Sequence, residues 1–229
     1  MRIGGLQRFS LIDYPGRICA IIFTQGCNFR CPYCHNPELV EPSLFQECIP
    51  EGEIFRFLEK RRGRLDAVVI TGGEPTIQSD LIPFVETIRA MGFLVKVDTN
   101  GSHPEVVEGL IGRRLVDYIS MDVKAPLHRY GEISGTPVDP ASIKRSIDMI
   151  VTSGIDHEFR TTVVPSLLDE GDLMEIGATV AGAARLVLQR FVPTTVLDNS
   201  LSTEETFDDE TFERLQRLLG KYVTTVSVR

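Results

Sequence analysis

Three of the five cysteines in this sequence lie within one short run, CNFRCPYC at residues 27–34. Thiolates at this spacing can bind three corners of a 4Fe–4S cluster, which ordinarily takes four cysteines. The fourth iron would then have no protein ligand, and an open coordination position is what a catalytic metal centre requires. We therefore expect Cys27, Cys31 and Cys34 to hold a catalytic iron–sulfur cluster.

A structural zinc ion, bound by the same three cysteines and His35, is the alternative. It would require the adjacent side chains of Cys34 and His35 to point at one metal. Zinc sites also usually place their second ligand pair further along the chain. We favour the cluster for these reasons. The other two cysteines, Cys19 and Cys48, are expected to be inert.

A second motif, Gly72-Gly73-Glu74-Pro75, follows the second expected strand. In parallel α/β folds, ligands bind at the edge where the strands end. Two glycines let a ligand approach the backbone closely, and Glu74 can accept hydrogen bonds from an ammonium group. Gly-Gly before Pro is also ordinary turn chemistry. The motif gains weight because the cysteine run follows the preceding strand and so lies at the same edge.

Four later strands end in polar residues at this edge. A helix cap or a turn explains any one of them, but together they predict the floor of a ligand site. The residues expected there are Asp98, Thr99, Asn100, Asp122, Lys124, Arg160, Thr162 and Gln189. Three histidines, His103, His128 and His157, have no partners at ligand spacing and are expected to be surface or core residues.

Alternating strands and helices must position these residues. Runs rich in β-branched residues predict strands at 17–24, 65–71, 93–99, 116–122, 158–164 and 185–192. Amphipathic segments predict helices at 51–62, 79–91, 139–152, 169–183 and 208–219. Repeated βα units indicate a parallel sheet, either open and doubly wound or closed into a partial barrel, and periodicity does not choose between these. Residues 222–228 alternate weakly and predict an edge strand.

The composition is that of an ordinary globular domain, with 229 residues, 42% hydrophobic and 24% charged, and a net charge of −8. There is no basic stripe of the kind that binds nucleic acid, so we expect no nucleic-acid partner. No apolar run is long enough to cross a membrane, and the first residues lack the apolar core of a secretory signal. We therefore expect no membrane association and a cytoplasmic location. No linker divides the chain, which predicts a single domain over residues 1–229.

The order and placement of the two motifs resemble the radical S-adenosylmethionine (radical SAM) superfamily. CxxxCxxC after the first strand and GGEP after the second are highly specific, and matching segments run from about residue 6 to residue 193. The resemblance implies an α/β fold, an incomplete (β/α)6 parallel barrel with its core at about 17–193. A C-terminal helix and an edge strand would follow within 204–229. It also implies that Cys27, Cys31 and Cys34 bind one 4Fe–4S cluster whose unique iron is chelated by the amino and carboxylate groups of S-adenosylmethionine.

The same resemblance implies roles for the other motif residues. Gly72, Gly73 and Glu74 would hold the methionyl ammonium group, and the backbone near Tyr33 would meet the adenine. A reduced cluster would pass one electron to the sulfonium, giving methionine and a 5′-deoxyadenosyl radical. The rest of the expected cofactor-binding set is Asp98, Thr99, Asn100, Asp122, Lys124, Arg160, Thr162 and Gln189.

A finer resemblance, carried by residues 10–39, is to the activating enzymes of glycyl radical enzymes. CPYCHN, Asp98-Thr99-Asn100-Gly101 and Asp122-Val123-Lys124 are typical of them. In the pyruvate formate-lyase activating enzyme, the matching segments lie beside the cofactor and a monovalent cation. Carried over, Asp98, Thr99 and Asp122 would ligate that cation, and Lys124 would approach the cofactor carboxylate as a catalytic residue. A Met of that enzyme is Ser120 here.

Within this group, the N-terminal segment most resembles the activating protein of anaerobic ribonucleoside-triphosphate reductase. We expect the chain to abstract a hydrogen atom from a backbone glycine of that reductase, leaving a glycyl radical. The expected partners are this enzyme and an electron donor such as flavodoxin or ferredoxin. Asp13, Tyr14, Pro15 and Gly16 precede the first expected strand, where the family often contacts the glycine loop of its target.

Three alternative functions stay open. The first is activation of pyruvate formate-lyase or another glycyl radical enzyme. The second is radical chemistry on a small molecule, as in carboxy-deazaguanine synthesis. The third is a non-catalytic iron–sulfur electron carrier or zinc-binding module, which would leave GGEP and the polar strand ends unexplained.

Overall fold

The computed structural model describes residues 1–229 and contains one eight-stranded sheet whose strands follow one another in chain order, from β1 to β8. The first strand pairs antiparallel with the second, and every later pair is parallel. The strands are β1 (Ile3–Ser10), β2 (Cys19–Thr24), β3 (Ala67–Gly72), β4 (Leu94–Thr99), β5 (Tyr118–Asp122), β6 (Asp156–Val163), β7 (Arg185–Arg190) and β8 (Thr225–Val228).

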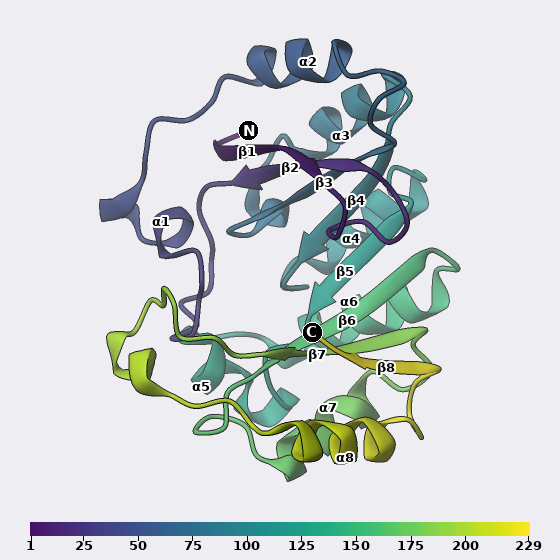
Figure 1. Cartoon of the computed structure of the whole chain (residues 1–229). Helices are drawn as coiled ribbons and strands as arrows, with labels where there is room; N and C mark the ends of the chain where they lie inside the picture. The colour runs from purple at the N-terminus through teal and green to yellow at the C-terminus, as the bar shows by residue number, and fades with distance from the viewer.

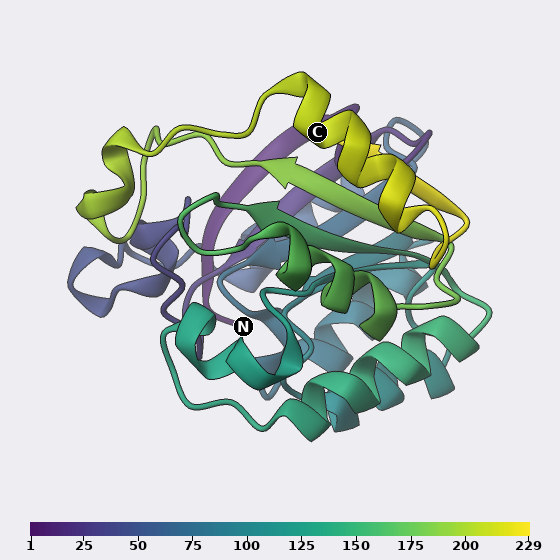
Figure 2. The ribbon, with the colours of Figure 1, turned by 90° about the horizontal axis from the view of Figure 1, so that it is seen from below.

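Helices connect the parallel strands and cover the outer face of the curved sheet (Figures 1 and 2). Because β1 and β8 do not pair, the sheet stays open between its two ends, which is the arrangement of an incomplete barrel. The α-helices are α1 (Pro37–Val40), α2 (Glu51–Glu59), α3 (Leu81–Ala90), α4 (Pro104–Gly112), α5 (Tyr130–Ser134), α6 (Pro140–Thr152), α7 (Glu170–Thr179) and α8 (Asp209–Leu219). No helix is long and apolar enough to cross a membrane.

Successive side chains of a strand point to opposite faces of a sheet, and here the two faces differ in chemistry. The outward face packs against the helices in a large apolar core, to which β4 contributes Val95 and Val97. The inward face is mixed. Its apolar part is a small cluster that includes Cys19, Ile21 and Val69, whereas β4, β5 and β6 turn charged residues inward. The interior of the barrel is therefore polar on the side of the later strands.

The expected strands and long helices are all present, with ends that differ by a few residues. One strand was not predicted. The segment Ile3–Ser10 forms β1, but Gly4 and Gly5 hide its pattern. A side chain at Gly4 would meet Leu39, and one at Gly5 would contact the ring of Phe23, so the glycines make room for neighbours. The sheet thus extends before and beyond the expected core of 17–193.

Helix α4 was also not predicted, because Gly109 and Gly112 weaken its pattern. Pro104 is at its start, where the missing amide hydrogen is not needed. Gly109 faces α3, since a Cβ atom there would lie 3.1 Å from Ile82. The helix therefore depends on packing against its neighbour more than on its own helix propensity.

Candidate cofactor-binding site

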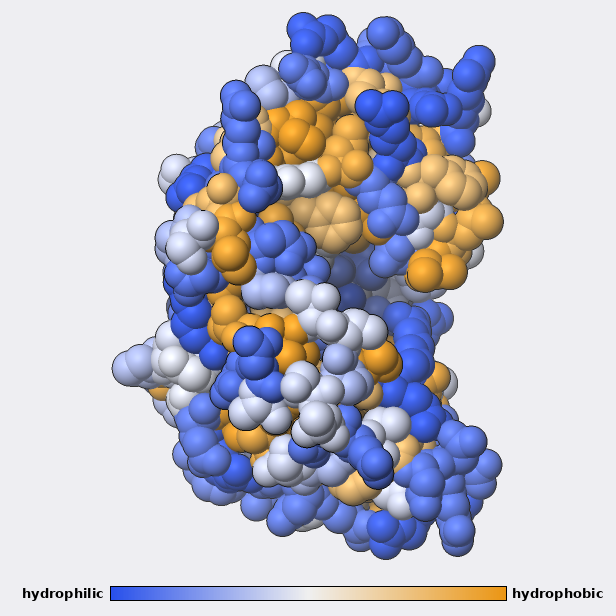
Figure 3. All heavy atoms as spheres, turned by 60° about the vertical axis from the view of Figure 1, so that its left-hand side comes forward, coloured by the Kyte–Doolittle hydropathy of each residue, from blue (hydrophilic) through white to orange (hydrophobic).

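One cavity of about 290 Å³ opens at the carboxyl ends of the parallel strands, and every residue predicted for the site lines it. The predicted members are Cys27, Cys31, Tyr33, Cys34, Gly72, Gly73, Glu74, Asp98, Thr99, Asn100, Asp122, Lys124, Arg160, Thr162 and Gln189. Figure 3 shows the open side of the molecule, where the surface is hollowed near the middle and hydrophilic residues lie in its depth. The structure therefore brings all of these predicted residues together around one cavity.

The cysteine loop follows β2 and is held by contacts from distant parts of the chain. The amide of Arg30 donates to the Ser134 carbonyl at 2.8 Å, and the amide of Asp198 donates to the Pro32 carbonyl at 2.9 Å. Gly135 packs so closely beneath the loop that a Cβ atom would overlap the Arg30 carbonyl oxygen. The loop is therefore fixed by backbone contacts that leave its thiols free.

The three thiols lie in a buried environment that favours their neutral form. Burial, with the nearby Glu74 carboxylate, raises the pKa of Cys27 to about 12. Burial also raises the pKa values of Cys31 and Cys34. A metal centre binds the thiolate, so loading this site requires release of the thiol protons.

The arrangement fits a cluster better than a zinc ion. No three Cys, His, Asp or Glu side chains converge closely enough to hold one metal ion. In a 4Fe–4S cluster each thiolate binds a different iron, so such convergence is not needed. His35 is also engaged elsewhere: its Nε2 lies 3.0 Å from the Val192 carbonyl oxygen, and its ring stacks on Phe191. The geometry therefore disfavours the zinc alternative.

Gly72 and Gly73, which were expected to hold the ligand ammonium group, also have a packing role. Both line the cavity, but a Cβ atom at Gly72 would overlap the backbone of Thr24, and one at Gly73 would overlap the Gly26 carbonyl oxygen. The φ of Gly72 is +113°, which L side chains rarely adopt. The lack of side chains thus lets β3 approach the start of the cysteine loop, and leaves backbone groups facing the cavity.

The carboxylate of Glu74, which was expected to help hold a ligand ammonium group, is engaged within the protein. Glu74 is 1% exposed, and its carboxylate accepts four hydrogen bonds. Thr76 donates to Oε1 through its amide at 3.0 Å and its hydroxyl at 2.5 Å. The Thr99 hydroxyl also donates to Oε1, at 2.7 Å, whereas Oε2 accepts only from the Asn100 amide, at 2.6 Å. Glu74 therefore ties the GGEP turn to the end of β4.

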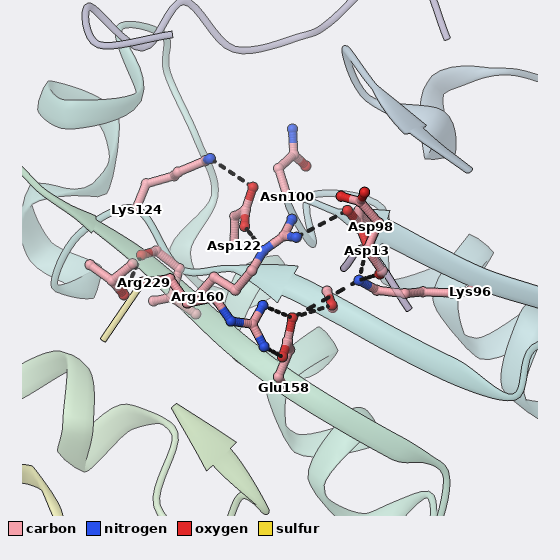
Figure 4. Close-up of polar contacts among 12 residues, drawn as sticks. Asp13, Lys96, Asp98, Asn100, Asp122, Lys124, Glu158, Arg160 and Arg229 are labelled. Atoms are coloured by element: carbon pink, nitrogen blue, oxygen red, sulfur yellow. Dashed lines mark hydrogen bonds and ion pairs between the residues drawn. The ribbon is translucent and has the colours of Figure 1, made fainter. Parts of the chain in front are cut away.

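Opposite the cysteines, two acids and two bases form a chain of ion pairs (Figure 4). The guanidinium of Arg160 lies between Asp98 and Asp122, at 3.0 and 2.7 Å. The second carboxylate oxygen of Asp122 accepts from Lys124 at 3.0 Å. Although burial opposes ionisation, Arg160 and Lys124 together lower the pKa of Asp122 well below its usual range. Asp122, Lys124 and Arg160 therefore keep their charges, and the two bases border the cavity.

The predicted monovalent cation finds no support in this arrangement. Arg160 occupies the position between Asp98 and Asp122 that was assigned to the cation. The third expected ligand, Thr99, directs its hydroxyl to Glu74. A cation would have to displace the guanidinium, so we assign it no part in the chemistry below.

The hydroxyl of Tyr33 is buried and lacks a hydrogen-bond partner. Buried polar groups are normally paired, so this hydroxyl suits a polar ligand in the cavity. Oδ1 of Asp98 accepts no hydrogen bond either, but it lies 3.3 Å from the ammonium group of Lys96. Thr162 and Gln189 pair across β6 and β7 and also face the cavity. The adjacent Arg190 instead pairs with Asp209 at 2.6 Å, outside the cavity.

Sequence reasoning missed Asn28, which joins the cysteine loop to the segment after β4. Its side-chain amide donates to the Ser102 hydroxyl at 2.9 Å, and its carbonyl accepts from Asn100 at 2.9 Å. Ser102 also lies 3.0 Å from the ring of His103, which is thus neither an isolated surface residue nor a core residue. A single Asn inside a cysteine run gives no periodic signal that could have identified it.

Eight further residues line the cavity that were not predicted for the cofactor site: Asp13, Ile21, Phe23, Phe29, His35, Asn36, Val40 and Thr71. Lys96 and Glu158 were also missed, and both are buried in the barrel interior. A signal existed for these two. Polar residues alternate with apolar ones at Lys96 and Asp98 in β4, and at Glu158 and Arg160 in β6.

Comparisons with known proteins agree with this geometry. The sequence model of the Radical SAM superfamily matches residues 21–176. A protein of Methanocaldococcus jannaschii, provisionally named as a glycyl-radical enzyme activating enzyme, is 35% identical over 232 residues, covering 99% of this chain and 95% of that protein. The pyruvate formate-lyase-activating enzyme of Clostridium pasteurianum is 27% identical over 177 residues, covering 73% of this chain and 71% of the enzyme.

Solved structures show the same fold. QueE of Escherichia coli superimposes with a TM-score of 0.61 at 19% identity, covering 99% of this chain and 92% of QueE. SuiB of Streptococcus suis, bound to its precursor peptide SuiA, gives a TM-score of 0.71 at 15% identity. That match covers 91% of this chain and 48% of SuiB, so the chain spans about half of that protein. At such identities the likeness concerns the fold alone, and it confirms the expected parallel partial barrel.

Proposed function

Because this chain belongs to the radical SAM superfamily, we propose that it is a glycyl-radical enzyme activating enzyme. Membership implies a 4Fe–4S cluster and S-adenosylmethionine. The activating role is supported by similarity over nearly the whole chain to the Methanocaldococcus jannaschii protein described above. The observation that carries the proposal is that three thiols and two paired bases face one another across a single cavity on the open side of the barrel.

The residues present fit both groups. An all-thiol donor set whose members do not converge on one ion suits a cluster. The unpaired hydroxyl of Tyr33 suits a polar ligand. When bound and reduced by an electron donor such as flavodoxin or ferredoxin, the cluster and S-adenosylmethionine together supply a carbon-centred radical that abstracts a hydrogen atom.

The chain's own residues would bind and orient. Cys27, Cys31 and Cys34 would each ligate one iron. Lys124 and Arg160 are the lysine and the arginine that line the cavity, and they would attract the carboxylate of S-adenosylmethionine. Their pairing with Asp98 and Asp122 holds both cationic groups in place before the ligand arrives, which reduces the entropy cost of binding.

The substrate glycine would enter from the open side. Ile21 and Phe23 of β2 line that part of the cavity together with Asp13, which precedes the strand. Their apolar surface would keep water away from a reactive radical. In the reaction, a Cα–H bond of the glycine breaks homolytically, and the hydrogen atom forms the new C–H bond of 5′-deoxyadenosine. The partner keeps the unpaired electron.

We propose anaerobic ribonucleoside-triphosphate reductase as the partner, on the resemblance of the N-terminal segment. A second candidate is a small-molecule enzyme. It is favoured by the 7-carboxy-7-deazaguanine synthase of Methanopyrus kandleri, 33% identical over 134 residues and covering 50% of this chain and 52% of that enzyme. A small-molecule enzyme would need no protein partner and would turn over repeatedly.

Electron paramagnetic resonance tests the proposal. The reconstituted, reduced protein would be mixed with S-adenosylmethionine and one candidate partner under anaerobic conditions. A glycyl doublet with the reductase is the expected result. A doublet with pyruvate formate-lyase alone would change the partner but keep the activating role. No doublet with any glycyl radical enzyme, together with repeated turnover of a small-molecule substrate, would overturn that role.

A further inference from the structure

Lys96 is a buried base that the proposed reaction does not use. Lys96 is 2% exposed, and its ammonium group points toward Asp13, Asp98 and Glu158 (Figure 4). It donates to the backbone carbonyl of Asp13 at 2.6 Å and pairs with Oδ1 of Asp98 at 3.3 Å. A third acid, Glu158, lies 4.0 Å away. A buried ammonium is costly without such partners, so these contacts define its position.

Glu158 does not depend on Lys96 for its pairing. It is fully buried and accepts hydrogen bonds from the Ser120 hydroxyl at 2.9 Å and from the Tyr118 hydroxyl at 3.3 Å. Arg229 of the last strand's end pairs with it at 3.1 Å. The shorter contacts of Lys96 are thus those to Asp13 and Asp98. These contacts join the segment between β1 and β2 to the end of β4.

One of these parts is the β1–β2 loop (Leu11–Ile18). The loop packs on the sheet through Tyr14, which is buried and whose ring centroid lies 5.7 Å from that of Tyr118. Its outer side is apolar, with Leu11 61% and Ile12 83% exposed. The other part is Asp98, whose carboxylate lines the cavity and also pairs with Arg160.

We propose that Lys96 is a positioning residue that couples the β1–β2 loop to the cofactor site. The Lys96 ammonium group donates a hydrogen bond to the Asp13 carbonyl of the loop and forms an ion pair with the Asp98 carboxylate. A change in the charge or position of Asp98 therefore alters the hydrogen bond that Lys96 makes to the loop. Coupling between two sites is reciprocal, so fixing the loop also favours cofactor binding. That the loop receives the protein substrate rests on the proposed function, whereas its coupling to Asp98 does not.

Hydrogen–deuterium exchange of the reconstituted protein tests this coupling without any partner. The probe is S-adenosylhomocysteine, which lacks the sulfonium and is not cleaved. In the wild-type protein it should slow exchange at residues 98–101, which reports binding, and at residues 11–17 by about fivefold, the lower end of typical coupling between sites. Slowing at 98–101 without slowing at 11–17 would overturn the proposal.

Variants separate coupling from folding. Lys96→Met should lose the slowing at residues 11–17 while keeping it at 98–101, and Lys96→Arg should restore it. If Lys96→Met does not fold, the double variant with Glu158→Gln removes one buried charge of each sign and serves in its place. Lys144→Met, at an exposed lysine paired with Asp148, is the control and should behave as wild type. Slowing of the loop in the Met variants would overturn the proposal. Because no glycyl radical is measured, either result leaves the activating role to its own test.

Discussion

The side-chain amide of Asn28, in the cysteine loop, donates a hydrogen bond to the hydroxyl of Ser102, 2.9 Å away and beyond the end of β4. Asn100 completes the link from the other side. The loop that carries the thiols is thus joined by neutral hydrogen bonds to the strand that carries Asp98. The two walls of the cavity are therefore held at a fixed separation by residues that need not touch a ligand.

Removal of this link is the first prediction. Asn28→Ala and Ser102→Ala should each lower the free energy of unfolding, with a coupling between them of about 0.5–1.5 kcal/mol, the usual net value of one hydrogen bond. Urea unfolding of the two single variants and the double variant measures it. Strict additivity of the two changes would contradict a direct interaction.

The second prediction concerns the thiols. Wild-type protein should take up about four irons per chain on anaerobic reconstitution. Cys34→Ala should lose most of this iron and all cleavage of S-adenosylmethionine. Cys48→Ala is the control, because Cys48 lies outside the cavity and its thiol contacts Gln25 at 3.4 Å. Normal iron content in Cys34→Ala would show that its thiol is not a ligand.

The third prediction compares two glycines. A methyl group at Gly73 would overlap the Gly26 carbonyl oxygen, so Gly73→Ala must push the start of the cysteine loop away from β3. We expect a destabilisation of about 1–3 kcal/mol, typical of overpacking, with reduced iron uptake.

Gly52 in α2 is the matched control, since nothing lies within 4 Å of a Cβ atom there. Gly52→Ala should stabilise the protein by about 0.5–1 kcal/mol because alanine is the better helix former. Thermal unfolding and iron analysis of both variants test the pair. Equal behaviour of the two would refute the packing role of Gly73.

Glu74 gives the fourth prediction. Gln replaces an acceptor oxygen by an NH2 group that must face the donors of Thr76, Thr99 or Asn100. Glu74→Gln should therefore cost about 1–3 kcal/mol of unfolding free energy, the penalty of an unsatisfied buried group. Glu47→Gln, at an exposed loop position, should cost almost nothing. Full stability of Glu74→Gln together with weaker cofactor binding would restore a direct ligand role.

Lys124 gives the fifth prediction. Its loss removes a cation from the cavity wall and leaves Asp122 with Arg160 alone. Lys124→Met should weaken binding of S-adenosylmethionine by about tenfold or more, as expected for one charged hydrogen bond. Iron content should stay normal. Isothermal titration, with Lys144→Met as control, measures the effect. An unchanged dissociation constant would remove Lys124 from the binding site.

The residues that line the site could be predicted from the sequence, but the contacts between their side chains could not. The ends of strands can be predicted because a polar residue at the end of an apolar run lies at the edge of the sheet, as Asp98 and Asp122 do. The partners of a side chain are not readable in the same way. Glu74 has the right type for an ammonium ligand, yet Thr76, Thr99 and Asn100 already donate to its carboxylate, and the approach of Thr99 and Asn100 depends on the tertiary fold.

Glycine caused the other errors. Gly4, Gly5 and Gly109 sit where a neighbour needs space, so each weakens the local pattern of a strand or helix that packing then stabilises. The position of the Arg160 guanidinium between Asp98 and Asp122 could not be predicted for a different reason. The sequence shows two acids and a base on adjacent strands, but their register, which pairs Asp122 with Arg160, comes only from the sheet.

The strand order has a consequence for synthesis. Because each strand pairs only with its neighbours in the chain, the sheet can grow strand by strand as the protein leaves the ribosome. The cysteine loop and the GGEP turn meet once β3 has formed, whereas Lys124, Arg160 and Gln189 are translated later. The nascent chain thus presents its thiols before the basic wall exists. The basic groups proposed to bind the ligand carboxylate are therefore the last part of the site to be acquired.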